Sequence, residues 1–252
     1  MLIDSHLHFL DENNEEIDQI IKRAKEKEVD ILILSGSSLE DNLRNINISN
    51  NYDNVYITLG YHPLDIAGLD DQALDLLEEQ LKTIKKVVAI GEIGLDYHYG
   101  KDNLEKQIYF FKKQLDFAIK YKLPVVIHMR DATKDTLDII KDYQLRGVFH
   151  CFSGSLETAR KIIDMGYYLG IGGILTFSNS NLAQIVKEID MDHLILETDS
   201  PFLSPLRGKK NEPQNIKIIA EKLAIIQDKS IDEVANITTK NVDNLFDLKV
   251  GK

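Results

Sequence analysis

Residues 104–128, LEKQIYFFKKQLDFAIKYKLPVVIH, contain the pattern that decides the fold. Apolar side chains recur there at spacings of three and four, which is typical of an amphipathic helix. They are Leu104, Ile108, Phe111, Leu115, Ala118 and Ile119. Pro124 ends this helix and starts a short apolar strand, Val125 to Ile127, which His128 follows directly. The segment therefore predicts a helix–strand unit with a polar residue at the carboxyl end of its strand.

The same alternation runs along the whole chain. Besides Val125 to Ile127, seven short apolar runs predict strands: Leu2-Ile3, Ile31 to Leu34, Val55 to Leu59, Val87 to Ile90, Val148-Phe149, Tyr167 to Ile171 and Leu194 to Leu196. Helical stripes lie between them, clearest over 17–24, 73–84 and 216–224. Runs that are apolar on both faces and alternate with helices indicate a parallel sheet covered by helices.

Eight strand–helix units in 252 residues match the usual size of a (β/α)8 TIM barrel. We find no linker or composition shift, so we expect one α/β barrel domain over residues 1–252. An open doubly wound sheet is the structural alternative. That fold usually has a glycine-rich first turn, whereas here the first strand ends in Asp4-Ser5-His6-Leu7-His8.

The composition limits the class of protein. Cys151 is the only cysteine, and the amino terminus shows no signal-peptide pattern. No apolar run approaches the roughly 20 residues that span a bilayer. We therefore expect a soluble, cytoplasmic protein with no membrane partner and no evident obligate protein partner.

The formal net charge of −11 argues against a broad basic surface that binds duplex DNA nonspecifically. A phosphate-bearing substrate would have to be held by a local positive charge. Two divalent cations would bring four positive charges to one place.

Six candidate metal ligands lie at or just beyond the carboxyl ends of five predicted strands. They are His6, His8, Glu92, His128, His150 and Asp199. In a parallel barrel these ends meet at one rim, where active sites are built. Coordination to cations would offset the cost of crowding imidazoles and carboxylates into one cavity.

His6 and His8 can both point into the barrel mouth, because alternate residues of a strand share a face. A His-x-His pair alone is a weak signal, since it is also compatible with two polar residues on an edge strand. The other four candidates make a metal site the better interpretation.

Several long motifs resemble the TatD family of metal-dependent hydrolases. They are Asp4 to His8, Gly60-Tyr61-His62-Pro63, Ala89 to Tyr97, Pro124 to Ala132, His150 to Gly154, Leu196 to Pro201 and Arg207 to Pro213. The resemblance runs nearly from end to end. It departs from the family pattern at Phe9-Leu10 and Met129, which affects the expected substrate preference rather than a ligand.

The resemblance implies a two-metal site. One ion would be held by His6, His8, Glu92 and Asp199, and the other by Glu92, His128 and His150, with Glu92 shared. It also implies a deoxyribonuclease that acts from 3′ ends on single strands. The ions would be Zn, Mn or Mg, since imidazole favours transition metals and phosphate chemistry also suits Mg.

The mechanistic hypothesis is in-line attack on a phosphodiester by a water that two metals activate. Asp199 would bind metal and accept the proton of that water, so Asp199 and Glu92 are the predicted catalytic residues. Glu197 should share the inward face of Asp199 and orient a ligand histidine. An ordinary buried ion pair is the alternative for Glu197.

Four further residues are predicted to bind substrate. Arg130 is a candidate phosphate clamp, with a surface salt bridge to Asp131 as the alternative. His62 is predicted to contact substrate or act as an acid, or else to cap the loop at Pro63.

Arg207 and Lys209, followed by Lys210, form a basic loop that could receive a nucleic-acid backbone or be merely solvated. Gly170-Ile171-Gly172-Gly173 is a further candidate to bind phosphate through backbone amides.

Three other functions use the same residues differently. A small-molecule amidohydrolase or phosphoesterase would place the cluster around another substrate. A PHP-type nuclease or phosphatase would normally supply more histidines than the seven present. The alternative that is not an enzyme is a noncatalytic module that only binds metal.

Overall fold

The computed structural model of this chain describes residues 1–100 and 102–249. Within them, eight strands form one sheet in chain order, β1 to β8, with helices between the strands. The fold is a (β/α)8 barrel, which confirms the predicted fold class. The chain divides into two compact units, which are described in turn, and the expectation of a single domain stays a prediction.

The first unit comprises Met1–Leu34 and His150–Lys252. Its elements are β1 (Leu2–Leu7), α1 (Asn14–Glu26), β2 (Val29–Leu34), α6 (Leu156–Asp164), β7 (Tyr168–Ile171), η1 (Gly173–Thr176), α7 (Leu182–Lys187), η2 (Met191–His193), β8 (Leu194–Leu196), η3 (Pro213–Asn215), α8 (Ile216–Gln227) and α9 (Ile231–Phe246). β1 pairs with β2 and β7 with β8, all in parallel. Leu7 forms a parallel bridge with Ser200, so the end of β1 lies beside the segment that follows β8.

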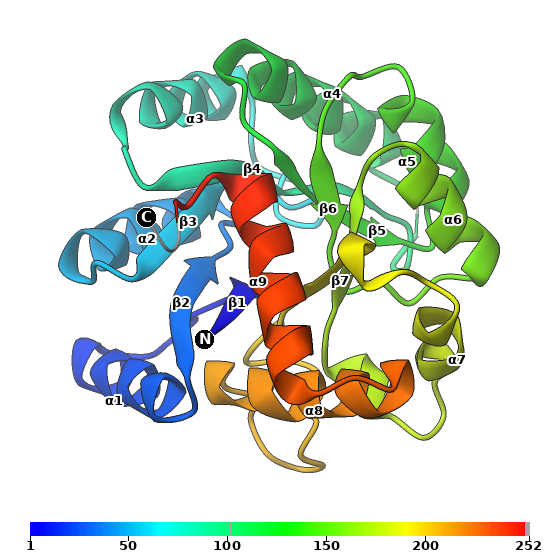
Figure 1. Cartoon of the computed structure of the whole chain (residues 1–252). Coiled ribbons are helices and arrows are strands. Elements are labelled where there is room, and N and C mark those ends of the chain that lie inside the picture. The colour runs from blue at the N-terminus through cyan, green and yellow to red at the C-terminus, as the bar shows by residue number, and fades with distance from the viewer. Residues whose placement is uncertain (101, 250–252) are drawn as a thin grey trace. The chain divides into compact units, whose positions relative to one another are not determined.

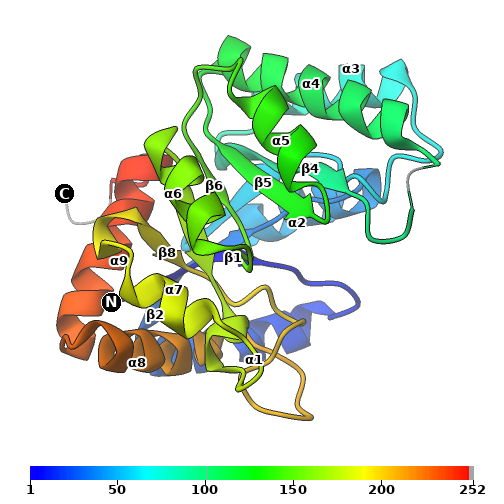
Figure 2. The ribbon, with the colours of Figure 1, turned by 90° about the vertical axis from the view of Figure 1, so that its right-hand side faces the viewer.

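Two helices cover the strands of this unit near the chain's end. α8 and α9 pack against each other, and α9 also contacts β1 and β8 (Figures 1 and 2). α9 begins with a capping box, because the Ser230 hydroxyl accepts from the backbone of Glu233 and the Glu233 carboxylate accepts from the backbone of Ser230. The helical stripes predicted from the sequence end at Ala224, so α9 is a helix that they do not include.

The second unit is Ser35–Phe149. Its elements are α2 (Leu39–Asn51), β3 (Val55–Leu59), α3 (Asp71–Thr83), β4 (Val87–Asp96), α4 (Leu104–Tyr121), β5 (Val125–Arg130), α5 (Thr133–Ile140) and β6 (Gly147–Phe149). β3, β4, β5 and β6 pair in parallel in that order. Every strand predicted from the sequence is present.

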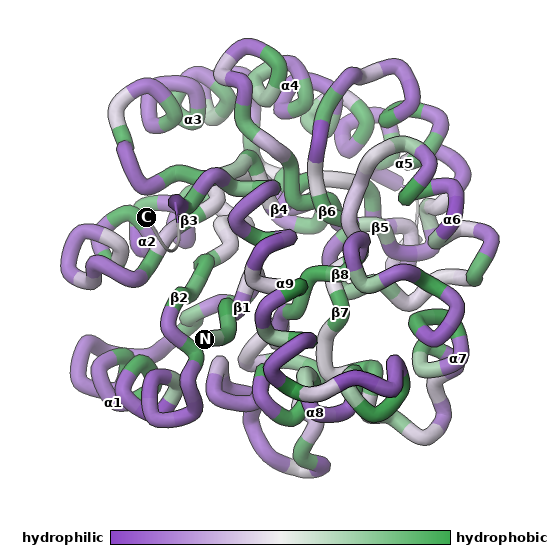
Figure 3. The backbone as a smooth tube through the Cα atoms, viewed as in Figure 1, coloured by the Kyte–Doolittle hydropathy of each residue, from purple (hydrophilic) through white to green (hydrophobic). Residues whose placement is uncertain are grey.

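Apolar residues concentrate in the strands, which appear as hydrophobic segments within each unit (Figure 3). Leu32 to Leu34 and Val125 to Ile127 are fully buried. Burial on both faces of a strand is what a parallel sheet under helices requires. Among the described residues, no helix combines the length and apolar character needed to cross a bilayer.

β4 is longer than its apolar run predicts, because it continues past Ile90 to Asp96. Its pairing with β5 shifts register between Ile90 and Ile93. Gly94 makes the close approach possible, since a Cβ there would lie 1.9 Å from the carbonyl oxygen of His128. Glu92 is therefore within β4, not beyond its end as the sequence analysis expected.

The buried face of α4 includes Phe111, Leu115 and Ala118 of the predicted stripe but is shifted away from Ile119, which is 52% exposed. Gln107 and Gln114 are buried as well. Each glutamine amide accepts from the N–H and donates to the carbonyl of one residue, Asp96 for Gln107 and Tyr61 for Gln114. Paired hydrogen bonds of this kind remove the cost of burying an amide, which apolar periodicity does not reveal.

Glu78 provides a test of how α3 is fastened to α4. Its carboxylate accepts from Lys120 and from the Tyr121 hydroxyl at 2.8 Å, and these hydrogen bonds lower the pKa of Glu78 to about 2. Since the folded-state pKa is depressed, the stabilisation is complete above the unfolded value of 4.5 and is lost as the pH falls towards 2.

We therefore expect Glu78→Gln to lower the free energy of unfolding by about 1 kcal/mol at pH 7, because the group is partly exposed. Urea titrations between pH 7 and pH 2 measure this effect, with Glu79→Gln as the matched control. A deficit that persists unchanged at pH 2 would contradict the electrostatic explanation.

Candidate metal centre

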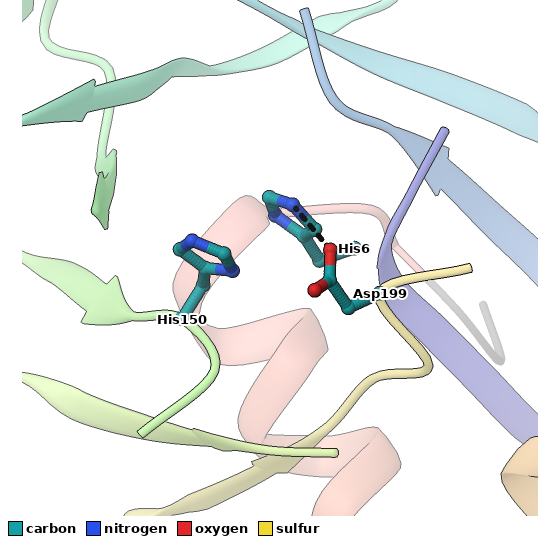
Figure 4. A group of neighbouring side chains, drawn as sticks. All are labelled: His6, His150 and Asp199. Carbon is teal, nitrogen blue, oxygen red and sulfur yellow. Dashed lines mark ion pairs between the residues drawn. The ribbon is translucent and has the colours of Figure 1, made fainter. Parts of the chain in front are cut away.

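Four of the predicted ligands come together in the first unit, as a group called here the first cluster: His6, His8, His150 and Asp199. His6 lies in β1, His150 follows β6 directly, and Asp199 lies three residues after β8. One ligand atom each from His6, His150 and Asp199 lie within 4.8 Å of one another (Figure 4). The three side chains thus converge on one point from three distant parts of the sequence.

The geometry around Asp199 is set by its neighbours on β1. Its Oδ1 lies 3.7 Å from Nε2 of His6 and 3.6 Å from Nε2 of His8, and these two nitrogens are 3.1 Å apart. The rings of His6 and His150 stack with centroids 4.1 Å apart. Three donor atoms therefore face each other across a small space.

The charge of Asp199 is maintained in spite of its burial. Burial acts to raise the pKa of Asp199, but the imidazoles of His8, His6 and His150 outweigh it and hold the pKa below its ordinary value. The backbone N–H of Asp199 donates to the carbonyl of His6 at 2.9 Å. Its φ of 55° lies in the left-handed region, which Asp and Asn tolerate better than most residues. The backbone thus aims an anionic carboxylate at the histidines.

Asp4 hydrogen-bonds to the segment that carries Asp199. It is fully buried and accepts hydrogen bonds from the backbone N–H and the hydroxyl of Thr198, the residue before Asp199. Burial raises the pKa of Asp4 to about 7, although the Thr198 hydrogen bonds oppose the rise. Asp4 therefore fixes the end of β8 to β1.

Glu197 lies near His150 in the first unit. Its Oε1 is 3.8 Å from Nδ1 of His150 and accepts from the backbone N–H of Cys151. Burial raises the pKa of Glu197 to about 8, and His150 acts against the rise. At 3.8 Å, Oε1 is beyond hydrogen-bond distance of Nδ1, so Glu197 lies beside the ring of His150 without bonding to it.

The glycines predicted to bind phosphate serve packing at two positions. A Cβ at Gly170 would lie 2.3 Å from Oε2 of Glu197, and a Cβ at Gly173 would lie 1.9 Å from the carbonyl oxygen of Leu203. Close approach of neighbouring groups accounts for both glycines.

Four side chains of the second unit form a group called here the second cluster: His62, Glu92, Asp96 and His128. His128 lies between two carboxylates, with Nδ1 2.8 Å from Oε1 of Glu92 and Nε2 2.9 Å from Oδ2 of Asp96. His62, Asp96 and His128 each offer a ligand atom within 4.8 Å of the others. Imidazole and carboxylate donors therefore gather here too.

The two nitrogens of His128 have different partners. Asp96 is 1% exposed, and its other oxygen accepts from the backbone N–H of His98 at 2.9 Å. Burial acts to raise the pKa of Asp96, but the His128 hydrogen bond outweighs it and lowers that pKa. In the neutral ring an anionic Asp96 favours the proton on Nε2, and a second hydrogen bond from Nδ1 to Glu92 requires a proton on both ring nitrogens.

His62 contacts its own loop, as the alternative to a substrate-binding role requires. Its Nδ1 accepts from the backbone N–H of Leu64 at 3.2 Å, which caps the loop after β3. A neutral ring that accepts at Nδ1 carries its proton on Nε2, which lies 3.5 Å from Oε1 of Glu92. In this tautomer His62 is a hydrogen-bond donor rather than a ligand.

The predicted substrate-binding residues lie on exposed segments. Arg130 ends β5, and its guanidinium lies 5.6 Å from the ring centroid of Tyr99. Asp131, the alternative partner of Arg130, pairs instead with Nδ1 of His98 at 2.9 Å. Arg207 and Lys209 are exposed in the loop after β8, whereas Lys210 pairs with Glu12.

The donor sets fit divalent cations. The first cluster offers imidazole nitrogens and a carboxylate that stays anionic, and the second offers a histidine held between two carboxylates. Zn²⁺ and other transition ions take these donors. A cation would also offset the negative charge of carboxylates buried in both clusters.

Two supporting residues, Asp4 and Asp96, were quoted in the sequence motifs but given no role. Strand alternation could have indicated them, because Asp4 shares a face with His6 and His8, and Asp96 shares one with Glu92 in an unbroken strand. Their partners, Thr198 and His128, are distant in the sequence and could not have been named from it.

A family model described as TatD related DNase matches residues 3–247. The chain belongs to the TatD family of metal-dependent hydrolases. This TatD-family chain is 39% identical over 253 residues to the "uncharacterized metal-dependent hydrolase YabD" of Bacillus subtilis, covering 98% of this chain and 99% of the relative. It is 32% identical over 262 residues to the hydrolase YcfH of Escherichia coli, covering 100% and 97%.

The TatD fold is also matched by a solved structure. The crystal structure of YjjV, a TatD homologue from Escherichia coli, has a TM-score of 0.93 and 29% identity, and the match covers 98% of each chain. The family resemblance noted in the sequence is thus confirmed over nearly the whole TatD-family chain.

Proposed function

We propose that this metal-dependent hydrolase is a deoxyribonuclease that cleaves phosphodiester bonds and acts from 3′ ends on single strands. The observation that carries the proposal is the convergence of imidazole and carboxylate donors in both clusters. The family description, TatD related DNase, supports nucleic acid as the substrate. With a net charge of −11, cations bound at the clusters would supply the local positive charge that a phosphate requires.

The proposal keeps the ligand assignment made from the sequence. His6, His8, Glu92 and Asp199 hold one divalent ion, and Glu92, His128 and His150 hold the other; the ions are Zn, Mn or Mg. Such ions, when bound, lower the pKa of water and stabilise charge on phosphate oxygens. The distances within each unit support the pairs His6 with Asp199, His8 with Asp199, and His128 with Glu92.

The chain's own residues then have defined tasks. Asp199, held anionic by its histidines, accepts a proton from the attacking water. Asp96 hydrogen-bonds to Nε2 of His128 and orients its ring, and Glu197 lies beside the ring of His150. His62 presents an N–H beside Glu92, which can hydrogen-bond to the substrate.

The exposed cations bind the substrate's phosphates. The Arg130 guanidinium can bind two phosphate oxygens at once, and its nearness to Tyr99 limits the conformations it samples. Arg207 and Lys209 bind the nucleic-acid backbone, since both are exposed after β8.

Metal removal and restoration test the proposal. Metal-stripped protein is incubated with 3′-labelled single-stranded DNA, RNA and a panel of small esters and amides, and one divalent ion is restored at a time. We expect restoration to raise the rate of DNA cleavage at least ~100-fold. Hydrolysis of small esters or amides without DNA cleavage under any ion would overturn the nuclease proposal in favour of a small-molecule hydrolase.

A further inference from the structure

A cavity of about 390 Å³ in the first unit adjoins the first cluster. It is called here the α1 cavity, because one face of α1 forms one of its walls. The residues of this wall are Glu15, Glu16, Gln19, Ile20 and Arg23. The opposite wall is the segment from Ser200 to Pro213, which joins β8 to α8. Its volume is within the range of pockets that bind small organic groups.

The α1 cavity begins at the candidate metal centre. His8 lines it, and so do Ser200 and Pro201, which directly follow Asp199. The backbone N–H of His8 donates to the carbonyl of Ser200 at 2.7 Å, which joins the two walls at this end. A group bound in the cavity would thus be adjacent to a phosphate held at the cluster.

Two ion pairs join the walls elsewhere. Arg23 donates to Glu212 through two nitrogens, at 2.8 and 2.9 Å, and Lys210 pairs with Glu12 at 2.5 Å. A bidentate guanidinium–carboxylate pair fixes geometry as well as charge. The residues of both pairs line the cavity, and a bound terminal group leaves the pairs in place.

The lining suits an uncharged, partly polar group. Phe9 and Ile20 are buried apolar residues at its surface, and the Gln19 amide offers both a donor and an acceptor. Four carboxylates line the cavity, whereas only two cationic side chains do. Two of these carboxylates, Glu12 and Glu212, pair with the cations, and Glu15 and Glu16 are in excess. A terminal phosphate, which carries about −1.5 to −2 charges, would be repelled.

We propose that the α1 cavity receives the terminal nucleoside of a nucleic-acid strand and selects ends that carry a free hydroxyl over ends that carry a phosphate. This inference rests on the proposed nuclease function and adds a substrate preference to it. The apolar surface contacts the base, and Gln19 hydrogen-bonds to the base edge. The excess of negatively charged carboxylates repels a strand end that carries a phosphate.

The first experiment compares metal-loaded wild-type protein on single-stranded DNA with a hydroxyl or a phosphate at each end. We expect kcat/KM to be at least ~10-fold higher for the hydroxyl at the end that is attacked, and the ratio to shrink at high salt. Glu15→Gln should lower the ratio by roughly threefold, since it removes one negative charge. Glu26→Gln, on the same helix but outside the cavity, should leave the ratio unchanged.

The second experiment fills the cavity. Gln19→Trp should lower kcat/KM for DNA at least ~10-fold while hydrolysis of methyl p-nitrophenyl phosphate stays within about twofold of wild type. Lys22→Trp is the matched control on the exposed side of α1. The thermal midpoint and the metal content of each variant establish that it is folded and loaded.

The outcomes separate the two proposals. Equal rates for hydroxyl and phosphate ends in an active wild type, or full DNA cleavage by a folded Gln19→Trp variant, would overturn the cavity assignment and leave the nuclease function standing. No DNA cleavage by the wild type, with the small diester still hydrolysed, would overturn the nuclease proposal and the cavity assignment with it.

Discussion

Asp199→Asn is expected to lower kcat for DNA cleavage by about 10³-fold while the fold persists. The carboxylate faces Nε2 of both His6 and His8, and its proposed role as proton acceptor requires the negative charge that Asn lacks. Asn is nearly the same size as Asp and tolerates the left-handed φ of 55°. The hydrogen bond from its backbone N–H to His6 is therefore retained.

The measurement is kcat at saturating metal, with the bound metal quantified in the same sample. Asp228→Asn is a matched control, because Asp228 has a φ of 51° but lies exposed at the end of α8. The control should keep wild-type kcat. Wild-type kcat in a metal-loaded Asp199→Asn variant would remove Asp199 from the proton-accepting role.

Asp96→Ala is expected to weaken metal binding by about 10- to 100-fold. Without the carboxylate 2.9 Å from Nε2 of His128, the ring loses the partner that fixes its tautomer and orientation. Asp96→Asn should have a smaller effect, because its single carbonyl oxygen can accept from either His128 or the His98 backbone. A positioning role predicts that metal affinity falls from wild type to Asp96→Asn and falls further in Asp96→Ala.

Calorimetric titration of metal-stripped protein measures the effect. Asp102→Ala, in the loop after β4, is the control and should bind metal as wild type does. If Asp96 acts only through His128, the metal affinity that depends on His6, His8 and Asp199 should change little. Identical affinities for Asp96→Ala and wild type would show that His128 needs no carboxylate behind it.

The strands could be predicted because each is short, apolar on both faces and bounded by helical segments. Their ends were harder to place, since β4 continues through Gly91 and Gly94, which weaken the apolar signal. The buried face of α4 was predicted only in part, since Phe111 and Leu115 are buried but Ile119 is not. Burial of Gln107 and Gln114 depends on backbone partners that periodicity does not reveal.

For the site, position at the strand ends predicted candidate metal ligands but not the residues that hydrogen-bond to them. The structure brings His6, His8, His150 and Asp199 together in one unit, and Glu92 beside His128 in the other. The hydrogen bonds from Thr198 to Asp4 and between His128 and Asp96 join residues far apart in the sequence. A polar residue on an inward face has several possible partners, and only the folded chain selects one.

The absence of a side chain at Gly170 has an evolutionary consequence. A methyl group there would collide with Oε2 of Glu197 at 2.3 Å and with Cα of His150 at 2.9 Å. A smaller residue at 197 leaves Gly170 undisturbed, whereas a larger residue at 170 requires both a smaller side chain at 197 and a shift of the His150 backbone. Relatives that carry a larger residue at 170 should therefore also carry a smaller one at 197.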